Sequence, residues 1–270
     1  MQTARWSRAL VTGASSGIGE AIARRLAAEG VELVLVARRK QRLEQVGREL
    51  ERSCPGGVEV IAADLTAVED SRRVEARLGS ADRPVDLLVN NVGGGRLSTF
   101  PEGPPEDEER WVRLNAIATL RLTAAALPGM RDRGRGTILN VSSGAALQPS
   151  PYAAVYGASK AFVNSFSQAI REENRRHGIV VTAVCPGFTD TDLPKRTGFD
   201  VQRVPRFLWM SADEVARRSL AAAAKGKAVY VPGMANKLGA LLARYAPGTV
   251  VVPFVARSTL SFWRRERSVS

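Results

Sequence analysis

The sequence is poor in the residues that build disulfide frameworks and metal centres. Its 270 residues include two cysteines, Cys54 and Cys185, and a single histidine. Two cysteines cannot form a disulfide framework, so a reducing, cytoplasmic compartment is the expected location. Neither cysteine has metal-ligand spacing, and no metal is expected.

Long apolar runs are also missing. A membrane-spanning helix needs roughly 18 to 20 uninterrupted apolar residues. The longest candidate, residues 249–256, is far shorter and contains Pro253. Residues 1–8 are polar, unlike the apolar centre of a secretory signal. The chain is therefore expected to be soluble, or at most peripheral at a membrane.

Acidic residues are scarce in the last part of the chain. The sequence has 39 Lys and Arg against 27 Asp and Glu, a net charge of +12. Residues 201–270 hold 12 basic and 3 acidic residues, whereas residues 1–200 hold 27 and 24. Such an excess indicates an anionic partner, and its position assigns that partner to the C-terminal part. Basic and aromatic residues are not interleaved in the core, so nucleic acid is not expected to bind.

Short apolar runs alternate with longer segments of helical periodicity. The expected strands are residues 9–12, 32–37, 58–64, 85–90, 137–142, 179–185 and 228–231. The expected helices are residues 18–29, 39–52, 68–78, 106–131, 153–177 and 211–225. This alternation is typical of a parallel sheet covered on both faces. A (β/α)8 barrel would need an eighth strand, so we expect an α/β fold: a doubly wound, seven-stranded parallel sheet in one domain over residues 1–232.

A glycine-rich turn joins the first strand to the first helix. It reads Thr12-Gly-Ala-Ser-Ser-Gly-Ile-Gly19, with glycines spaced Gly-x3-Gly-x-Gly. Glycines let backbone N–H groups approach a pyrophosphate, and the helix N-terminus adds partial positive charge. The second strand ends in Arg38-Arg39-Lys40 without a carboxylate, which favours NADP(H) over NAD(H). Arg38, at the end of the strand, is the expected contact to the 2′-phosphate, with Ser15 as its hydroxyl neighbour, whereas Arg39, Lys40 and Arg42 could simply be the solvated start of a helix.

A second motif carries acid–base chemistry. Tyr156 and Lys160 are spaced i, i+4 at the start of a long helix, which places them on one face. A nearby ammonium should lower the pKa of the tyrosine from its reference of ~10. Such a pair alone is more often a surface feature, but Ser143, at the end of the preceding strand, should face the same crevice. Asn115 lies on the preceding long helix, where an amide is otherwise unfavourable.

Together these motifs resemble the short-chain dehydrogenase/reductase family. The glycine turn, the segment Asn90-Asn-Val-Gly93, Asn115, Ser143, Tyr156, Lys160 and the segment 186–191 match in order and spacing over about residues 5–232. Val92 departs from the family's usual alanine, and Gly94-Gly95 extends the glycine run. The resemblance implies a Rossmann-type fold, an oxidoreductase activity, a homodimer or homotetramer, and a small carbonyl or alcohol substrate.

The resemblance also implies roles for individual residues. Tyr156 would exchange a proton with the substrate oxygen, Ser143 would orient the carbonyl, Lys160 would bind the nicotinamide ribose, and the Asn115 backbone would hold a water in a proton relay. The expected cofactor-binding residues are Gly13, Ser15, Ser16, Gly17, Ile18, Gly19, Arg38, Arg39, Asp64, Leu65, Asn91, Gly93, Tyr156, Lys160, Pro186, Gly187, Thr189 and Thr191. An alternative function is a regulatory protein that senses NADP(H) without catalysis.

Two further segments bear on the substrate and on partners. Residues 188–210 form the expected substrate loop, whose apolar side chains indicate a lipid-like, 3-oxoacyl or steroid-like substrate or else pack the loop onto the core. Residues 233–270 extend past the family core, with an amphipathic helix expected over 234–245 and an apolar, then basic, stretch over 250–267. This extension could pack on its own core, on a partner subunit, or on an anionic membrane surface.

Overall fold

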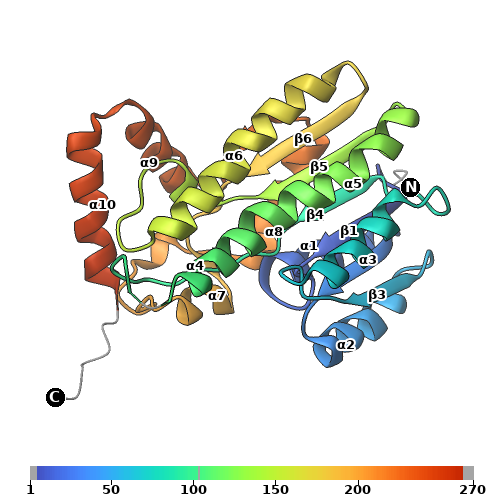
Figure 1. The fold of residues 1–270 in the computed structure, drawn as a ribbon, viewed down its shortest axis with the longest axis horizontal. Helices are drawn as coiled ribbons and strands as arrows, with labels where there is room; N and C mark the ends of the chain where they lie inside the picture. The colour runs from blue at the N-terminus through green and yellow to red at the C-terminus, as the bar shows by residue number, and fades with distance from the viewer. Residues whose placement is uncertain (1–4, 103, 264–270) are drawn as a thin grey trace.

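The computed structural model describes residues 5–102 and 104–263, and its centre is a seven-stranded parallel sheet (Figure 1). The strand order is β3-β2-β1-β4-β5-β6-β9. The strands are β1 (Arg8–Thr12), β2 (Glu32–Ala37), β3 (Val58–Ala62), β4 (Leu87–Asn90), β5 (Gly136–Val141), β6 (Ile179–Val184) and β9 (Val229–Tyr230). The expected doubly wound fold is confirmed, and each of the seven strands lies within two residues of its predicted bounds.

Helices cover both faces of the sheet because both faces of each strand are apolar. In β2, Leu33 and Leu35 pack in one buried cluster while Val34 and Val36 pack in the other. The first cluster includes side chains of α1 (Gly17–Ala28), α2 (Lys40–Glu51) and α8 (Ala212–Ala224). The second includes side chains of α3 (Val68–Gly79), α5 (Ala118–Asp132) and α6 (Ala154–Arg175).

The strand order reverses beside β1, and this reversal positions the functional site. β1 pairs with β2 on one side and with β4 on the other, in parallel register. The connections after β1 and β4 therefore leave the sheet in opposite directions and open a crevice between them at the carboxyl ends of the strands. The glycine-rich turn after Thr12 and the segment after Asn90 both begin at this edge.

The helix expected over 106–131 is not continuous. It divides into α4 (Pro105–Val112), a π-helical turn η1 (Arg113–Ile117) and α5. Asn115 lies inside this turn with its side chain fully buried and hydrogen-bonded to the β4–α4 loop. Periodicity alone cannot locate such a widened turn, because these contacts come from residues distant in the sequence.

The C-terminal extension forms two helices. α9 (Met234–Tyr245) matches its predicted bounds, and α10 (Gly248–Phe262) was not predicted. Pro253 lies inside α10, where an interior proline normally argues against a helix. The basic residues expected after Trp263 lie outside the described part of the chain. Within residues 5–102 and 104–263, no helix combines the length and hydropathy needed to cross a membrane.

Candidate active site

The glycine-rich turn after β1 is held in a shape that only glycine fits. Gly13 and Gly17 have φ values of +67° and +59°, which L-residues with side chains rarely adopt. A Cβ on Gly13 would lie 2.7 Å from Nδ2 of Asn91, and one on Gly19 would collide with the backbone of Gly13. Asn91 in turn donates from Nδ2 to the carbonyl oxygen of Thr12 at 2.9 Å. The turn and the segment after β4 therefore form one rigid cradle.

This cradle fits a dinucleotide pyrophosphate. Ser16 precedes the first turn of α1 in an extended conformation, and Gly17, Ile18 and Gly19 begin the helix. The N–H groups of a first helical turn point toward an anion, and the helix dipole favours negative charge there. Glycine at positions 13 and 19 lets the turn pack directly against Asn91 and against its own backbone, where a Cβ would collide.

Two arginines follow β2, and their contacts differ from the sequence expectation. Nη2 of Arg39, not Arg38, lies 3.3 Å from the backbone oxygen and 3.4 Å from Oγ of Ser15. Arg38 instead faces Asp64, with Nη1 3.7 Å from Oδ2 and a side chain 66% exposed. The direction of each guanidinium depends on partners in the neighbouring loops, which a run of three cations does not reveal. Both arginines flank the end of the strand where an adenosine ribose would lie.

Asp64 is fastened at the end of β3. Its Oδ1 accepts hydrogen bonds from Thr66 N at 3.0 Å and Thr66 Oγ1 at 2.7 Å, and its Oδ2 lies 3.1 Å from Nη2 of Arg110. Burial raises the pKa of Asp64, but the Thr66 hydrogen bonds and the Arg110 and Arg38 charges outweigh it, leaving the pKa below its usual value. The carboxylate therefore stays ionised beside Leu65, which is buried.

Asn115 connects the β4–α4 loop to α6. Its Oδ1 accepts from Gly94 N at 2.9 Å, and its Nδ2 donates to Gly94 O at 2.8 Å and to Ser159 Oγ at 2.9 Å. The Asn115 carbonyl oxygen accepts a hydrogen bond from Thr119 Oγ1 at 2.9 Å. Sequence reasoning missed Ser159 and Thr119. Their i+3 and i+4 spacing from Tyr156 and Asn115 is the signal that could have found them.

The Ser143 hydroxyl lies close enough to the Tyr156 phenol to influence its pKa. Burial raises the pKa of the Tyr156 phenol above its ordinary value, and the nearby Ser143 hydroxyl opposes this rise without cancelling it. The lowering of this pKa that was expected from Lys160 is therefore wrong. Its Nζ is directed elsewhere, donating to the carbonyl oxygen of Val141 at 3.0 Å.

Lys160 is a buried ammonium at the centre of the site. Lys160 is only 4% exposed, and this burial lowers the pKa of its ammonium group to about 8. A Cβ on Gly93 would lie 2.8 Å from Nζ, and one on Gly95 would lie 2.8 Å from the Tyr156 ring. Glycines after β4 therefore allow the Tyr156-Lys160 pair to approach the loop closely.

The lowered pKa of Lys160 should make stability depend on pH. An unfolded lysine keeps its proton to about pH 10.5, whereas folded Lys160 releases it near pH 8, so the unfolded chain binds more protons between these values. The free energy of unfolding of the cofactor-free protein should rise by ~1 kcal/mol from pH 8 to 9. Above pH 9 the raised pKa of Cys185, about 11, acts in the opposite direction.

Urea unfolding at several pH values measures this rise. Lys160→Met should abolish it, and Lys40→Met, at an exposed position, should retain it. Equal slopes in the wild type and Lys160→Met would contradict the assignment.

The segment after β6 lies over the cofactor cradle. A Cβ on Gly17 would lie 3.0 Å from Cγ2 of Thr191, which places this threonine beside the glycine-rich turn. Thr189 is buried and donates from Oγ1 to Gly187 O at 3.1 Å. Pro186 O accepts from Gly144 N at 2.7 Å, which ties this segment to the loop after Ser143. Thus the predicted residues of the segment 186–191 lie beside both the glycine-rich turn and the loop after Ser143.

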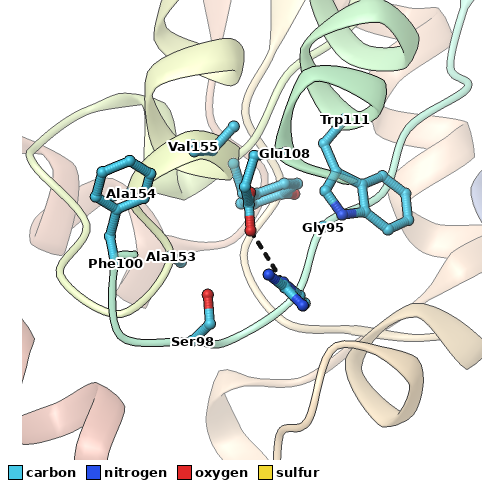
Figure 2. Close-up of a pocket in the computed structure, with 10 residues that line it drawn as sticks. Gly95, Ser98, Phe100, Glu108, Trp111, Ala153, Ala154 and Val155 are labelled. Carbon is cyan, nitrogen blue, oxygen red and sulfur yellow. Dashed lines mark hydrogen bonds and ion pairs between the residues drawn. The ribbon is translucent and has the colours of Figure 1, made fainter. Parts of the chain in front are cut away.

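A small pocket lies beside Tyr156, between the β4–α4 loop and the start of α6 (Figure 2). Figure 2 shows Phe100 and Trp111 on opposite sides of Glu108. Nε of Arg96 lies 2.9 Å from Oε1 of Glu108, in an ion pair. This ion pair fixes the loop to α4. In the described chain, no group of His, Cys, Asp and Glu could hold a metal ion.

The substrate loop contains the short strands β7 (Thr189–Asp190) and β8 (Met210–Ser211) and the helices α7 (Asp192–Arg196) and η3 (Arg206–Leu208). Phe188 contacts the rings of Phe199 and Trp209, with centroids 5.4 and 5.5 Å apart. Val204 is 3% exposed, whereas Phe207 is 76% exposed. Much of the loop's apolar surface therefore packs within the protein.

Comparison with known proteins gives consistent matches. The sequence profile of the family described as short chain dehydrogenase matches residues 7–201. The chain is 35% identical over 191 residues to the very-long-chain 3-oxoacyl-CoA reductase of Bos taurus, covering 69% of this chain and 61% of that protein. It is 33% identical over 214 residues to human 17-beta-hydroxysteroid dehydrogenase type 3, covering 78% and 66%. The chain thus spans less than two thirds of the reductase's length.

Solved structures match over nearly the whole chain. A short-chain dehydrogenase from Sphingobium yanoikuyae in complex with NADPH has a TM-score of 0.80 and 34% identity, covering 97% of this chain and 98% of that one. A bulky-bulky ketone specific alcohol dehydrogenase from Comamonas testosteroni has a TM-score of 0.76 and 31% identity, covering 97% and 96%. These matches extend over the C-terminal helices.

Proposed function

The chain belongs to the short-chain dehydrogenase family and is an oxidoreductase, and on that premise we propose that it transfers a hydride between NADP(H) and the carbonyl carbon of an apolar ketone. The observation that carries the proposal is the convergence of the Ser143–Tyr156 pair and buried Lys160 beside the glycine cradle. The reaction is reversible, so a secondary alcohol would be the substrate in the other direction.

Each residue has a distinct role in the proposed reaction. In reduction, a bound NADPH would supply the hydride, and Tyr156 would give its phenolic proton to the carbonyl oxygen as negative charge develops there. Ser143 donates a hydrogen bond to the same oxygen and stabilises that charge. Lys160 would hold the nicotinamide ribose, and its ammonium would favour the phenolate that Tyr156 leaves behind.

Asn115 would hold the proton-relay end of the site. The π-helical turn and the bonds from its side chain to Gly94 and Ser159 fix its backbone. Its carbonyl oxygen accepts from Thr119 and has a second lone pair for a water. Protons could then return to Tyr156 through Lys160 and that water.

The preference for NADP(H) rests on charge at the end of β2. The segment presents Arg38 and Arg39 and no carboxylate, and a 2′-phosphate needs cations where a 2′-hydroxyl would need an acid. The similarity to an NADPH complex from Sphingobium yanoikuyae supports the same preference.

The apolar substrate class rests on the substrate loop. Aromatic and aliphatic side chains recur through residues 188–210, and the similar proteins include a 3-oxoacyl-CoA reductase and a bulky ketone alcohol dehydrogenase. A ketone with two bulky apolar substituents, such as a steroid or an acyl chain, fits these features best.

A panel of carbonyl compounds and alcohols, assayed with NADPH and with NADH, tests this function. We expect NADPH-dependent reduction of bulky apolar ketones, with higher kcat/KM than for short polar carbonyl compounds. A protein that binds NADPH tightly and reduces nothing in the panel would instead be a cofactor sensor.

Two exposed apolar surfaces support proposals about partners. The surface of α4, η1, α5 and α6 exposes Val112, Ile117, Leu120 and Phe162, and we assign a second copy of the chain to it.

α9 forms the second surface. Its apolar side chains exposed to solvent are Met234, Leu238, Leu241, Leu242 and Tyr245. No acidic residue lies in residues 215–263, so an anionic membrane complements this second surface in charge as well as in hydropathy. Co-sedimentation should show more pelleting with anionic than with neutral vesicles.

A further inference from the structure

The far end of α10 is joined to the substrate loop by the backbone. Asp200 N donates to Phe262 O at 2.6 Å, and Phe199 forms an antiparallel bridge with Trp263. Nη1 of Arg203 adds a hydrogen bond to Ser261 O at 3.5 Å. On its other side the same loop segment is held by the β4–α4 loop, since Leu97 N donates to Thr197 O at 2.8 Å. The segment 197–203 therefore lies between the site and α10.

Aromatic rings reinforce this junction. The Phe262 ring meets Phe188 edge to face, with centroids 6.1 Å apart, and so joins the cluster that Phe188 forms with Phe199 and Trp209. The Trp263 ring lies 5.7 Å from the ring of Tyr152. Thus two consecutive residues of the C-terminal extension contact both the substrate loop and the turn that precedes the catalytic helix.

Tyr152 has an unusual backbone at this point of contact. Its φ is +65°, a conformation that residues with side chains rarely adopt. It stands four residues before Tyr156, and its carbonyl oxygen accepts from Ser98 N at 2.9 Å. Strained backbone of this kind persists where surrounding structure requires it and is concentrated at ligand-binding sites and switch regions. Here it presents the ring to Trp263.

The remainder of α10 has a different character. Figure 1 shows α10 standing apart from the sheet layers, with its far end meeting the substrate loop. Val250 and Phe254, nearer its start, are 62% and 69% exposed. The helix is therefore attached to the segment 197–203 through its last residues.

We propose that Trp263 and Tyr152 form a latch that holds the substrate loop over Tyr156, and that opening this latch admits bulky substrates. A loop clamped on both sides encloses small substrates without further change. A bulky apolar ketone would need the loop and the end of α10 to move together. The latch makes Trp263 a specificity-determining residue supplied by the C-terminal extension. Only the substrate-selection part rests on the proposed function.

Limited proteolysis tests the latch without any turnover. Trypsin cleaves after Arg203 and Arg206 in the substrate loop, and cleavage requires the loop to open. Full-length Trp263→Ala should be cut there at least about fivefold faster than wild type, and Phe254→Ala, on the outward face of the same helix, should be cut at the wild-type rate. Tyr152→Gly removes the other ring, and glycine accepts the positive φ, so this variant should fold and give the same phenotype.

Coupling between the two rings sharpens the test. If Trp263 and Tyr152 act through one contact, the double variant should be cut no faster than either single variant. Trp263→Phe should restore slow cleavage. Wild-type cleavage rates in both Trp263→Ala and Tyr152→Gly would overturn the latch.

Kinetics tests the consequence for substrate choice. Trp263→Ala should raise the ratio of kcat/KM for a bulky ketone to that for a small one by about tenfold. Faster cleavage with an unchanged ratio would overturn the role in specificity. Faster cleavage in a protein that reduces no ketone would leave the latch standing and contradict the proposed function instead.

Discussion

Tyr156→Phe should lower kcat for ketone reduction by about 10²- to 10⁴-fold, the range expected when a general acid is removed. Phenylalanine fills the same space beside Gly95, so the cradle and the loop after β4 should keep their shape. It has no proton to give to the developing alkoxide, and the interaction with Ser143 is lost. The loss should therefore appear in kcat, not in the dissociation constant of NADPH.

Steady-state kinetics with NADPH fluorescence titration measures both quantities. Ser143→Ala is the informative companion, because it removes the Ser143 hydroxyl and keeps the proton donor, and it should lose less activity than Tyr156→Phe. Val155→Ala, next to the tyrosine and lining the adjacent pocket, serves as a neighbouring control with near wild-type kcat. A Tyr156→Phe enzyme that retains wild-type kcat would refute the assigned acid.

Replacing both Arg38 and Arg39 with alanine should weaken NADPH binding by about 10- to 10²-fold, or about 1.4–2.8 kcal/mol. The expected contact is a charge-assisted hydrogen bond from each guanidinium to the 2′-phosphate, reduced in strength because Arg38 is 66% exposed. NADH lacks this phosphate, so its binding should be little changed. The ratio of NADPH to NADH affinity should therefore fall toward one.

The single variants separate the two arginines. Arg39 is placed by Ser15 and Arg38 by Asp64, so the larger single effect identifies which guanidinium reaches the phosphate. Lys40→Ala is the matched control, because Lys40 is the next cation along the chain and its Nζ lies 3.9 Å from Oε1 of Glu44. A double variant that weakens NADH and NADPH binding equally would show that these arginines do not recognise the 2′-phosphate.

Much of the fold could be predicted because its determinants are local. Residues 33–36 of β2 alternate between the two buried clusters, so an unbroken apolar run of this length already indicates a strand covered on both faces. Gly13 and Gly17 adopt positive φ within a turn that their own spacing suggests. In contrast, α10 was not predicted, because it contains Pro253 and an interior proline argues against a helix. Its last residues are held by hydrogen bonds to the substrate loop.

The site likewise has features that local spacing predicts and features that depend on residues distant in the sequence. The order and spacing of Ser143, Tyr156 and Lys160 predict that these residues meet, because a strand end and one helical face should bring them together. The π-helical turn at Asn115 depends on Gly94 and Ser159, which are far away in sequence. The hydrophobic periodicity of a sequence does not predict such contacts.

What the sequence alone determined is therefore the parallel sheet and the glycine-rich turn, and it predicts Tyr156 as the acid–base group. Only the tertiary structure decided the direction of the Tyr156 pKa shift, the partner of each arginine, and the attachment of α10 to the substrate loop. The physical reason is the distance along the sequence over which each effect acts. Propensity and spacing act over a few residues, whereas burial, the aim of a charged side chain and the packing of rings are set by segments that meet only after folding.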